Sequence, residues 1–461
     1  MRLQKKGFDW PFYRRLLMVA LPIIVQNGIT NVVQLLDNVM VGQVGTVQMS
    51  GVAIVNQLIF VFSLCVFGAT SGAGIFTAQF HGSGNPEGVR DTFRFKLLVA
   101  ALLTAAGVTI FLVGAEPLIG LYLEGDPGSE AAAQTLSCGR EYLFMSLVGL
   151  PPFALSNAYS STLRETGQTD VPMKAGITAV FVNLVLNYVL IFGNFGAPAM
   201  GVVGAALATV ISRYVELAIM VVWTHTHERE CPFIRGAYRS FRIPGALAKQ
   251  IIVKGMPLLA NEFFWSTGVA FLSQCYSTRG LVVVAALNIA NTINQVSNVV
   301  FLSLGNAVGI LMGQMLGAGV PEQQIRRDNR RMIGVSVGVC FVIGGVMIAL
   351  SGLFPRMYNT TDEVRAMAAA LICISSAMMP AFSYNNAMYF TLRSGGQTFI
   401  TFLFDSGFSW AVSVPLAFVL SRFTEMPILW LYACCSAVDA LKIGLGAYFL
   451  KKGTWIRRLA D

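Results

Sequence analysis

The stretch KLLVAALLTAAGVTIFLVG, residues 96–114, is apolar on every side and decides the class of fold. A helix needs roughly 20 such residues to cross the hydrocarbon core of a membrane, which is about 30 Å thick. A strand of a membrane barrel would instead have about 10 residues with apolar and polar positions alternating. Similar stretches recur from one end of the chain to the other, so the sequence predicts an all-α integral membrane protein.

We expect twelve transmembrane helices joined by short connections, with no inserted soluble domain. The chain of 461 residues is 55% hydrophobic and only 12% charged, whereas a water-soluble surface needs far more charge. The predicted spans begin near residues 16, 50, 93, 138, 171, 199, 246, 284, 332, 366, 399 and 427.

The net charge of +9 follows the predicted spans and does not indicate a nucleic-acid partner. Basic residues are concentrated in 2–15, 90–96, 229–242, 326–331 and 451–458, which lie before the first span, in even-numbered connections and after the last span. The connection between spans three and four is acidic. Because cytoplasmic connections carry an excess of Lys and Arg, we expect both termini in the cytoplasm of a cell whose plasma (inner) membrane holds the protein.

An internal repeat divides the chain into two similar halves. GAGIFTAQFHGSGNPEG at 72–88 aligns with AVGILMGQMLGAGVPEQ at 307–323, and TLRETGQT at 162–169 aligns with TLRSGGQT at 391–398. The matched pairs include Gly74 with Gly309, Gln79 with Gln314, Gly82 with Gly317, Gly84 with Gly319, Pro86 with Pro321, and Pro22 with Pro257.

The repeat predicts two pseudo-symmetric six-helix bundles with the same orientation in the membrane. Such bundles can rock around a central site and open it to either side in turn, which favours a transporter over a channel. The predicted segments are a cytoplasmic amphipathic N-terminus (1–15), an N-lobe (16–225), a cytoplasmic linker (226–245), a C-lobe (246–450) and a basic cytoplasmic tail (451–461).

Ionisable residues within apolar spans are the candidates for function, because a charge there costs roughly 2.5–3.5 kcal/mol on insertion scales. Two pairs, Arg213 with Glu216 and Asp439 with Lys442, are spaced three residues apart, and we interpret each as a local ion pair. The unpaired carboxylates are those of Asp37, Glu262 and Asp405.

Asp37 and Glu262 each leave two interpretations open. Asp37 has no Lys or Arg within two turns of its own helix, so it either binds a cation or proton or is a hydrated carboxylate at the interface. Glu262 follows Pro257 by about one turn, where the proline loosens the helix. It is either a second functional carboxylate or a partner for a helix end.

The sequence gives no sign of an enzyme or of a resident cofactor. It contains no P-loop, no H-E-x-x-H and no G-x-S-x-G motif, and its three histidines lie in predicted connections. The eight cysteines form no C-x-x-C pair, and most lie inside apolar spans as packing residues.

Five stretches resemble the multidrug and toxic compound extrusion (MATE) family over nearly the whole chain. They are LLDNVMVGQVG at 35–45, GAGIFTAQFHGSGN at 72–85, TLRETGQTDVPM at 162–173, FVNLVLNYVLIFG at 181–193 and GVVGAALATVISR at 201–213. The resemblance implies two lobes around a central cavity and export of amphiphilic, often cationic, compounds in exchange for Na⁺ or H⁺.

The resemblance also implies a coupling site in the N-lobe. Asp37 is similar to the family's first-helix carboxylate, Asn183 and Asn187 match polar positions of the fifth helix, and Thr209 matches one of the sixth. One carboxylate with amide and hydroxyl oxygens suits Na⁺, and Asp37 alone suits a proton.

The chain departs from the family at three acidic positions. Some branches have an aspartate where Asn187 stands, others a helix-seven carboxylate where Trp265 stands, and the tenth-helix acid is replaced by Asn385 and Asn386. We therefore expect no intact cation site in the C-lobe, and Glu262 is our own candidate for a second carboxylate.

We expect amphiphilic small molecules and membrane lipids as the partners of a monomeric protein, with no nucleic acid and no cofactor beyond the coupling ion. The substrate would lie against apolar and aromatic walls, for which Phe (32) and Met (19) are abundant. The rival within transport is a lipid-linked oligosaccharide flippase, which would need a basic cavity for pyrophosphate. The candidate substrate-cavity residues are Gln34, Asn261, Trp265, Tyr384 and Asn385.

Overall fold

The computed structural model describes residues 10–122 and 130–459. By length and composition, ten helical segments in these ranges can cross a membrane. The helices of the first half are α1 (Trp10–Gly42), α2 (Thr46–Gly82), α3 (Pro86–Gly120), α4 (Glu130–Leu147), α5 (Leu150–Glu165), α6 (Asp170–Phe192) and α7 (Gly201–Thr226). Those of the second half are α8 (Gly245–Ser277), α9 (Leu281–Gly317), α10 (Glu322–Leu350), α11 (Asp362–Ser394), α12 (Thr398–Phe402), α13 (Val414–Phe423), α14 (Ile428–Val438) and α15 (Leu441–Lys452).

Three of the predicted spans are interrupted helices. The fourth breaks between α4 and α5, where Pro151 and Pro152 follow Gly149 and supply no backbone N–H for the preceding turn. The eleventh passes through two π-helical turns, Leu403–Gly407 and Ser409–Ser413, between α12 and α13. The twelfth breaks between α14 and α15. With α4–α5 and α8 added to the ten apolar segments, the described residues form twelve rods, as the sequence predicts.

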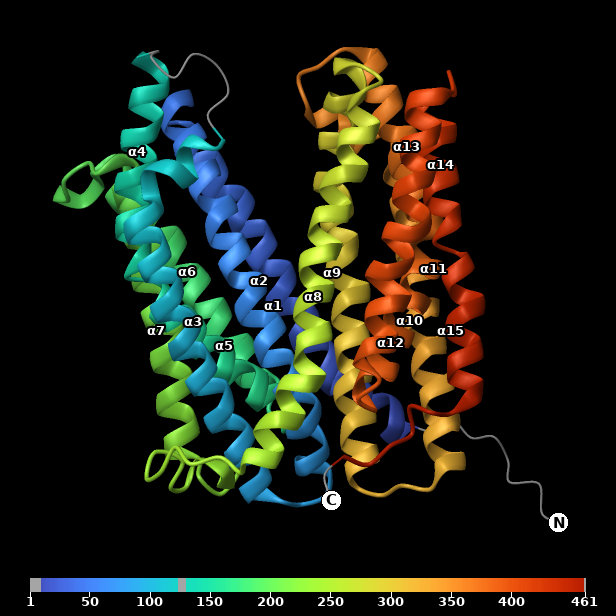
Figure 1. The fold of residues 1–461 in the computed structure, drawn as a ribbon. Coiled ribbons are helices and arrows are strands. Elements are labelled where there is room, and N and C mark those ends of the chain that lie inside the picture. Colours follow the sequence, from blue (N-terminus) through green and yellow to red (C-terminus); the bar gives the residue numbers. More distant parts are fainter. Residues whose placement is uncertain (1–9, 123–129, 460–461) are drawn as a thin grey trace.

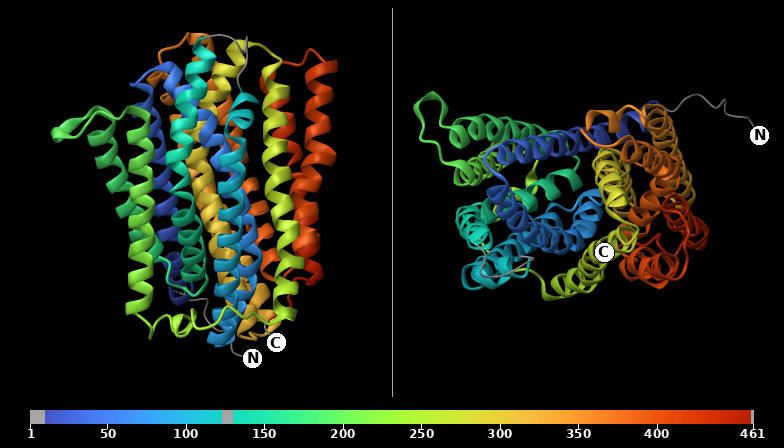
Figure 2. Two further views of the ribbon diagram at one scale, coloured as in Figure 1. Left: turned by 60° about the vertical axis from the view of Figure 1, so that its left-hand side comes forward. Right: turned by 90° about the horizontal axis from the view of Figure 1, so that it is seen from above.

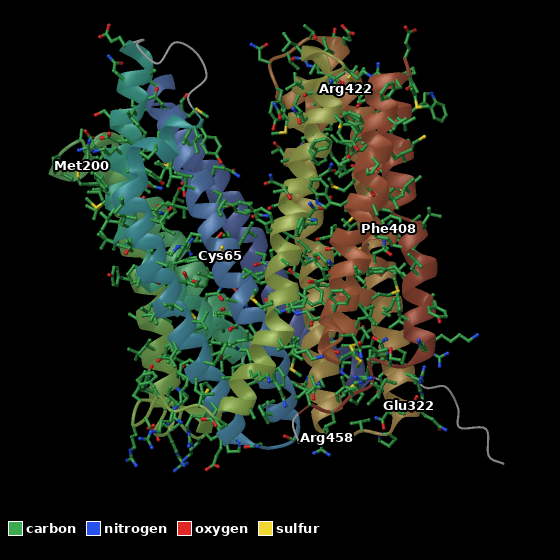
Figure 3. The ribbon with its side chains drawn as sticks, in the orientation of Figure 1. Cys65, Met200, Glu322, Phe408, Arg422 and Arg458 are labelled. Carbon is green, nitrogen blue, oxygen red and sulfur yellow. The ribbon has the colours of Figure 1, made fainter. Side chains whose placement is uncertain are left out.

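The rods form two groups, α1–α7 and α8–α15, whose ribbons meet toward the end where α1 begins and α15 ends, and diverge toward the other end (Figure 1). The view from above separates the same two groups (Figure 2). We call the end where α1 begins and α15 ends the closed end. Glu322 and Arg458 lie at this end, whereas Met200 and Arg422 lie toward the other (Figure 3).

The hydrophobic cores explain why the groups meet at one end only. Toward the diverging end each half has a core of its own, with Val52, Phe111 and Ile119 in the first half and Val283, Leu371 and Leu431 in the second. Toward the closed end the cores are shared: Leu16 and Ile23 of α1 pack among second-half residues.

The first part of α8 packs in the opposite half in the same way as the first part of α1. Its Ile251 and Leu258 pack in a core made mainly of first-half residues, including Phe76 and Phe93. The lobes predicted as 16–225 and 246–450 therefore exchange the first parts of α1 and α8, which the repeat pairs through Pro22 and Pro257. Burying this apolar surface across the halves stabilises the closed end.

Two repeat-related glutamines bond across the closed end in a crossed pattern. Gln79 Nε2 of α2 donates to the backbone oxygen of Ser394 (2.9 Å), and Gln314 Nε2 of α9 donates to that of Glu165 (2.9 Å). Because Glu165 and Ser394 are also repeat equivalents, the two bonds are related by the pseudo-symmetry of the halves.

Repeat-related glycines allow the same close approach. A Cβ at Gly82 would meet the Gln314 backbone, and a Cβ at Gly317 would meet the Gln79 backbone. Any side chain at either glycine would push α2 and α9 apart, which explains the Q-x-x-G spacing in both halves.

The predicted linker 226–245 is packed, not extended. Phe233 and Ile234 are buried in the shared core, and Arg94 of α3 donates to the backbone oxygens of Ala237 (2.8 Å) and Gly236. The predicted terminal segments also differ in extent. Residues 10–15 already belong to α1, residues 451–452 belong to α15, and residues 1–9 and 460–461 lie outside the described residues.

Candidate functional site

The structure brings the four predicted N-lobe residues together. Asp37 lies in the last part of α1, where Asn187 Nδ2 of α6 donates to its Oδ1 at 2.6 Å. Asn187 also donates to Asn183 Oδ1 one turn away (3.1 Å), and the Asn183 amide contacts Thr209 Oγ1 of α7 at 3.2 Å. Helical spacing of four residues places both amides on the face of α6 toward Asp37.

The Asn183 amide has a second orientation that satisfies it better. When the amide is turned, its nitrogen donates to the Asp37 oxygens at 3.0 and 3.2 Å and its oxygen accepts from Thr209 at 3.2 Å. The bond from Asn187 to Asn183 Oδ1 is then lost, and the carboxylate of Asp37 is held by two amide groups.

One buried polar atom of this cluster lacks a hydrogen-bond partner in the described part of the chain. Asn187 Oδ1 is buried and has no hydrogen-bond donor among the described residues. A buried acceptor without a partner is costly, so it is available to a cation or to a bound proton. The oxygens of Asp37, Asn187, Asn183 and Thr209 form a set of hard donors that fits Na⁺ as well as H⁺.

Two further residues interact with Asp37 that sequence spacing did not reveal. Arg213 of α7 and Tyr142 of α4 lie close enough to interact with it electrostatically, and Tyr142 donates to Asn56 at 3.3 Å. Because both residues belong to other helices than Asp37, a search for partners along its own helix could not find them.

Both predicted local ion pairs are confirmed. Arg213 pairs with Glu216 at 3.2 Å, and Lys442 pairs with Asp439 at 3.3 Å. Lys442 also lies 3.6 Å from Asp405, which the sequence left unpaired. One ammonium thus joins two carboxylates from separate rods, at the π-helical turns that carry Asp405.

Glu262 lies on α8, beside this second-half cluster. It interacts electrostatically with Arg393 and Asp405, and no hydrogen bond to its carboxylate is recorded among the described residues. Its role as a second carboxylate stays a prediction.

The five predicted substrate-cavity residues do not share one cavity. Trp265 lines a cavity of about 470 Å³ in the second half. Asn261 is instead buried against Asp405 (3.1 Å), and Asn385 donates to the backbone oxygen of Asp439 (2.9 Å). Tyr384 packs in a small core around Phe404, and Gln34 is exposed on α1.

The second-half cavity has the size and character of a small-molecule site. Aromatic walls with a few polar groups are typical of ligand pockets of about 300–1,000 Å³. Its lining includes Trp265, Tyr276, Phe301, Phe382, Tyr432, Asn291, Asn294, Asn298 and Asp439. Asn291 is the repeat equivalent of Asn56, but its place on a cavity wall could not be read from spacing.

Two similar helical bundles that enclose buried ionisable clusters and meet at one end define a multi-pass membrane transporter. The family model MatE matches residues 22–189 and 257–419, one segment in each half. The chain belongs to the MatE family, which is a family of transporters and not of enzymes.

Curated relatives and solved structures agree with this assignment. The chain is 27% identical over 459 residues to a protein of Bacillus subtilis described as probable multidrug resistance protein YoeA, covering 97% of this chain and 96% of that protein. It is 25% identical to a probable multidrug resistance protein NorM of Thermotoga maritima, covering 96% and 93%.

The fold matches solved structures at low sequence identity. An outward-facing multidrug resistance MATE family transporter superposes with a TM-score of 0.87 at 15% identity, covering 98% of this chain and 99% of that chain. A Vibrio cholerae MATE transporter superposes with a TM-score of 0.86 at 17% identity, covering 96% and 97%.

Proposed function

We propose that this protein exports amphiphilic, often cationic, organic molecules from the cell in exchange for H⁺ or Na⁺ that binds at Asp37. The observation that carries the proposal is the Asp37 cluster, in which a carboxylate lies among amides and Asn187 Oδ1 has no donor. Curated relatives described as multidrug resistance proteins support the substrate class.

The ion and the substrate need different affinities for the two conformations of the lobes, since otherwise neither would drive the other. In the present conformation the lobes are joined at the closed end, where α1 begins and α15 ends. With the termini in the cytoplasm of a plasma-membrane protein, this conformation faces outward, and a cation entering Asp37 from outside would promote release of the substrate.

The second-half cavity is our candidate for part of the substrate path. Its aromatic walls suit a flat hydrophobic cation, and Asp439 supplies a carboxylate that is shared with Lys442. The flippase alternative, with a lipid-linked pyrophosphate as substrate, gains no support from the relatives.

The test is efflux of ethidium from proteoliposomes that hold the full chain, with pH and Na⁺ gradients imposed separately. A gradient that accelerates efflux identifies the coupling ion. If neither gradient changes the rate, the protein is not a cation-coupled exporter. Light scattering coupled to size exclusion on the same preparation tests the expected monomer.

A further inference from the structure

A polar cavity of about 150 Å³ lies between the two halves toward the closed end. Its walls come from α1, α2, α5 and α7 of the first half and from α9 and α11 of the second. The coupling cluster at Asp37 does not line it. The charged residues that line it are Arg164, Glu165, Arg213, Glu216 and Arg393.

Arg164 and Arg393 are equivalent residues of the internal repeat. Each is the arginine of the TLR triplet that begins TLRETGQT in the first half and TLRSGGQT in the second. One guanidinium from each half therefore faces the same cavity, on either side of the interface between the halves.

The carboxylates that line the cavity already have cations of their own. Glu165 pairs with the fully buried Lys96 at 2.5 Å, and Glu216 pairs with Arg213 at 3.2 Å. Within the described part of the chain, neither Arg164 nor Arg393 has a carboxylate within 4.0 Å.

The two guanidinium groups are held by neutral partners instead. Arg164 Nη2 donates to Gln26 Oε1 at 2.7 Å, and Arg393 Nη2 donates to the backbone oxygen of Ser71 at 3.3 Å. Arg393 also lies over the ring of Phe390, 5.2 Å from its centroid. These contacts orient both groups, and the neighbouring carboxylates act on them only at longer range, Glu165 and Glu216 on Arg164 and Glu262 on Arg393.

Two buried polar atoms on the cavity wall have no partner among the described residues. They are Arg164 Nε and Ser156 Oγ. An unpaired guanidinium N–H in a buried site costs more than an ordinary lost hydrogen bond, because the group is charged. Both atoms can donate to an oxygen placed in the cavity.

We propose that this cavity binds a small oxyanion, either a carboxylate or a phosphate group, between Arg164 and Arg393. Guanidinium groups match the paired oxygens of such anions, and two of them from opposite walls repel a cation. The bound anion joins the two halves and thereby favours the conformation that is shut at this end.

The anion can be free in solution or carried by a lipid headgroup, and the same chemistry serves both. Asp37 does not line the cavity, although Arg213, which interacts with Asp37 electrostatically, does. The proposal is therefore tested by a binding measurement that does not depend on cation-coupled export. Binding of radiolabelled inorganic phosphate is measured by equilibrium dialysis on the full chain in nanodiscs of phosphatidylcholine, at constant ionic strength.

We expect a saturable phosphate site in the unmodified protein. Arg164→Gln and Arg393→Gln should each weaken it about tenfold, because either change breaks the bridge between the halves. Arg393→Lys should retain part of the affinity. Arg140→Gln, which removes an exposed arginine of α4 that pairs with Glu116, is the matched control and should bind phosphate normally.

A second arm uses nanodiscs that contain phosphatidylglycerol. Loss of phosphate binding in these nanodiscs, with phosphatidylglycerol retained by the unmodified protein but not by Arg393→Gln, identifies the lipid headgroup as the ligand. Equal phosphate affinity in all variants, or no binding of either ligand that depends on Arg164 and Arg393, overturns the proposal. Ethidium efflux by the same variants reports separately on export.

Discussion

At the scale of single residues, the Asp37 carboxylate has its hydrogen bonds from uncharged groups. Asn187 and Asn183 can stabilise it in either protonation state, because an amide presents both a donor and an acceptor. A site built in this way can gain and lose a positive ion without losing its structure. Such reversibility is what the proposed exchange mechanism requires of Asp37.

We predict that Asp37→Asn abolishes the gradient-driven part of ethidium efflux, a fall of about tenfold or more in the initial rate. The amide is close in shape to the carboxylate but holds neither a proton nor a cation. Efflux from proteoliposomes with an imposed gradient measures the effect. Asp362→Asn, at an exposed carboxylate, is the control, and undiminished gradient-driven efflux by the Asp37 variant removes this residue from the mechanism.

A second residue-scale prediction concerns Lys96, whose side chain is 0% exposed beside Glu165. The Glu165 side chain is 13% exposed, and Lys96→Met removes its ion partner. We expect this change to lower the free energy of unfolding by about 3–5 kcal/mol. Denaturation in mixed micelles measures it. The double variant Lys96→Met/Glu165→Gln should recover most of the loss, and a single variant as stable as the parent would contradict the ion pair.

At the scale of elements, α2 and α9 approach each other closely where they cross between the halves. Gln79 and Gln314 bond in the crossed pattern described above, and Gly82 and Gly317 leave no room for a side chain. This crossing has to open if the transporter faces the other side. Its hydrogen bonds to backbone oxygens can be exchanged for water at modest cost.

We predict that Gly317→Ala weakens this crossing, because the new methyl group overlaps the Gln79 backbone. A cysteine introduced at position 78 of α2 should then react with a maleimide about tenfold faster than in the parent background, since the local opening becomes more populated. Gly338→Ala, on α10 where a Cβ meets no atom within 4 Å, is the control. Equal reaction rates in all three backgrounds would show that the crossing does not govern access.

At the scale of the whole molecule, two shared cores lie toward the closed end and two separate cores toward the other. The first parts of α1 and α8 each pack in the opposite half. The halves are therefore joined by two exchanged helix segments as well as by contacts between their surfaces. Rocking of the halves has to preserve the separate cores while it repacks the shared ones. Because the shared cores are the ones that repack, we expect the two halves to move apart at the closed end.

We predict that a disulfide between Ala78→Cys and Gly313→Cys stops transport. A Cβ at Gly313 lies 2.9 Å from the Ala78 Cβ, shorter than the roughly 3.5–4.5 Å of a disulfide, so the two helices have to separate slightly for the bond to form. Oxidation should reduce ethidium efflux at least about tenfold, and reduction with dithiothreitol should restore it. Each single variant controls for the eight native cysteines, and full efflux by the cross-linked protein would refute alternating access at this end.

Sequence determined the class of fold, the number of rods and the two halves, because the length of an apolar run and the period of a repeat are properties of the chain itself. It also identified the Asp37 group through family resemblance, and the local pairs of Arg213 and Lys442 through helical spacing. What these features share is that each is visible along one segment or by comparing two segments.

Tertiary structure alone decided which side chains from different rods meet. Asp405 lies beside Lys442, Tyr142 faces Asp37, and Asn261 is buried where a substrate wall was predicted. In the sequence Arg164 and Arg393 stand out only as members of the repeated TLR triplet, yet they face one cavity between the halves. Contacts of this kind depend on the rotation and crossing of helices, which are set by the packing of side chains throughout the bundle and leave no period in the sequence.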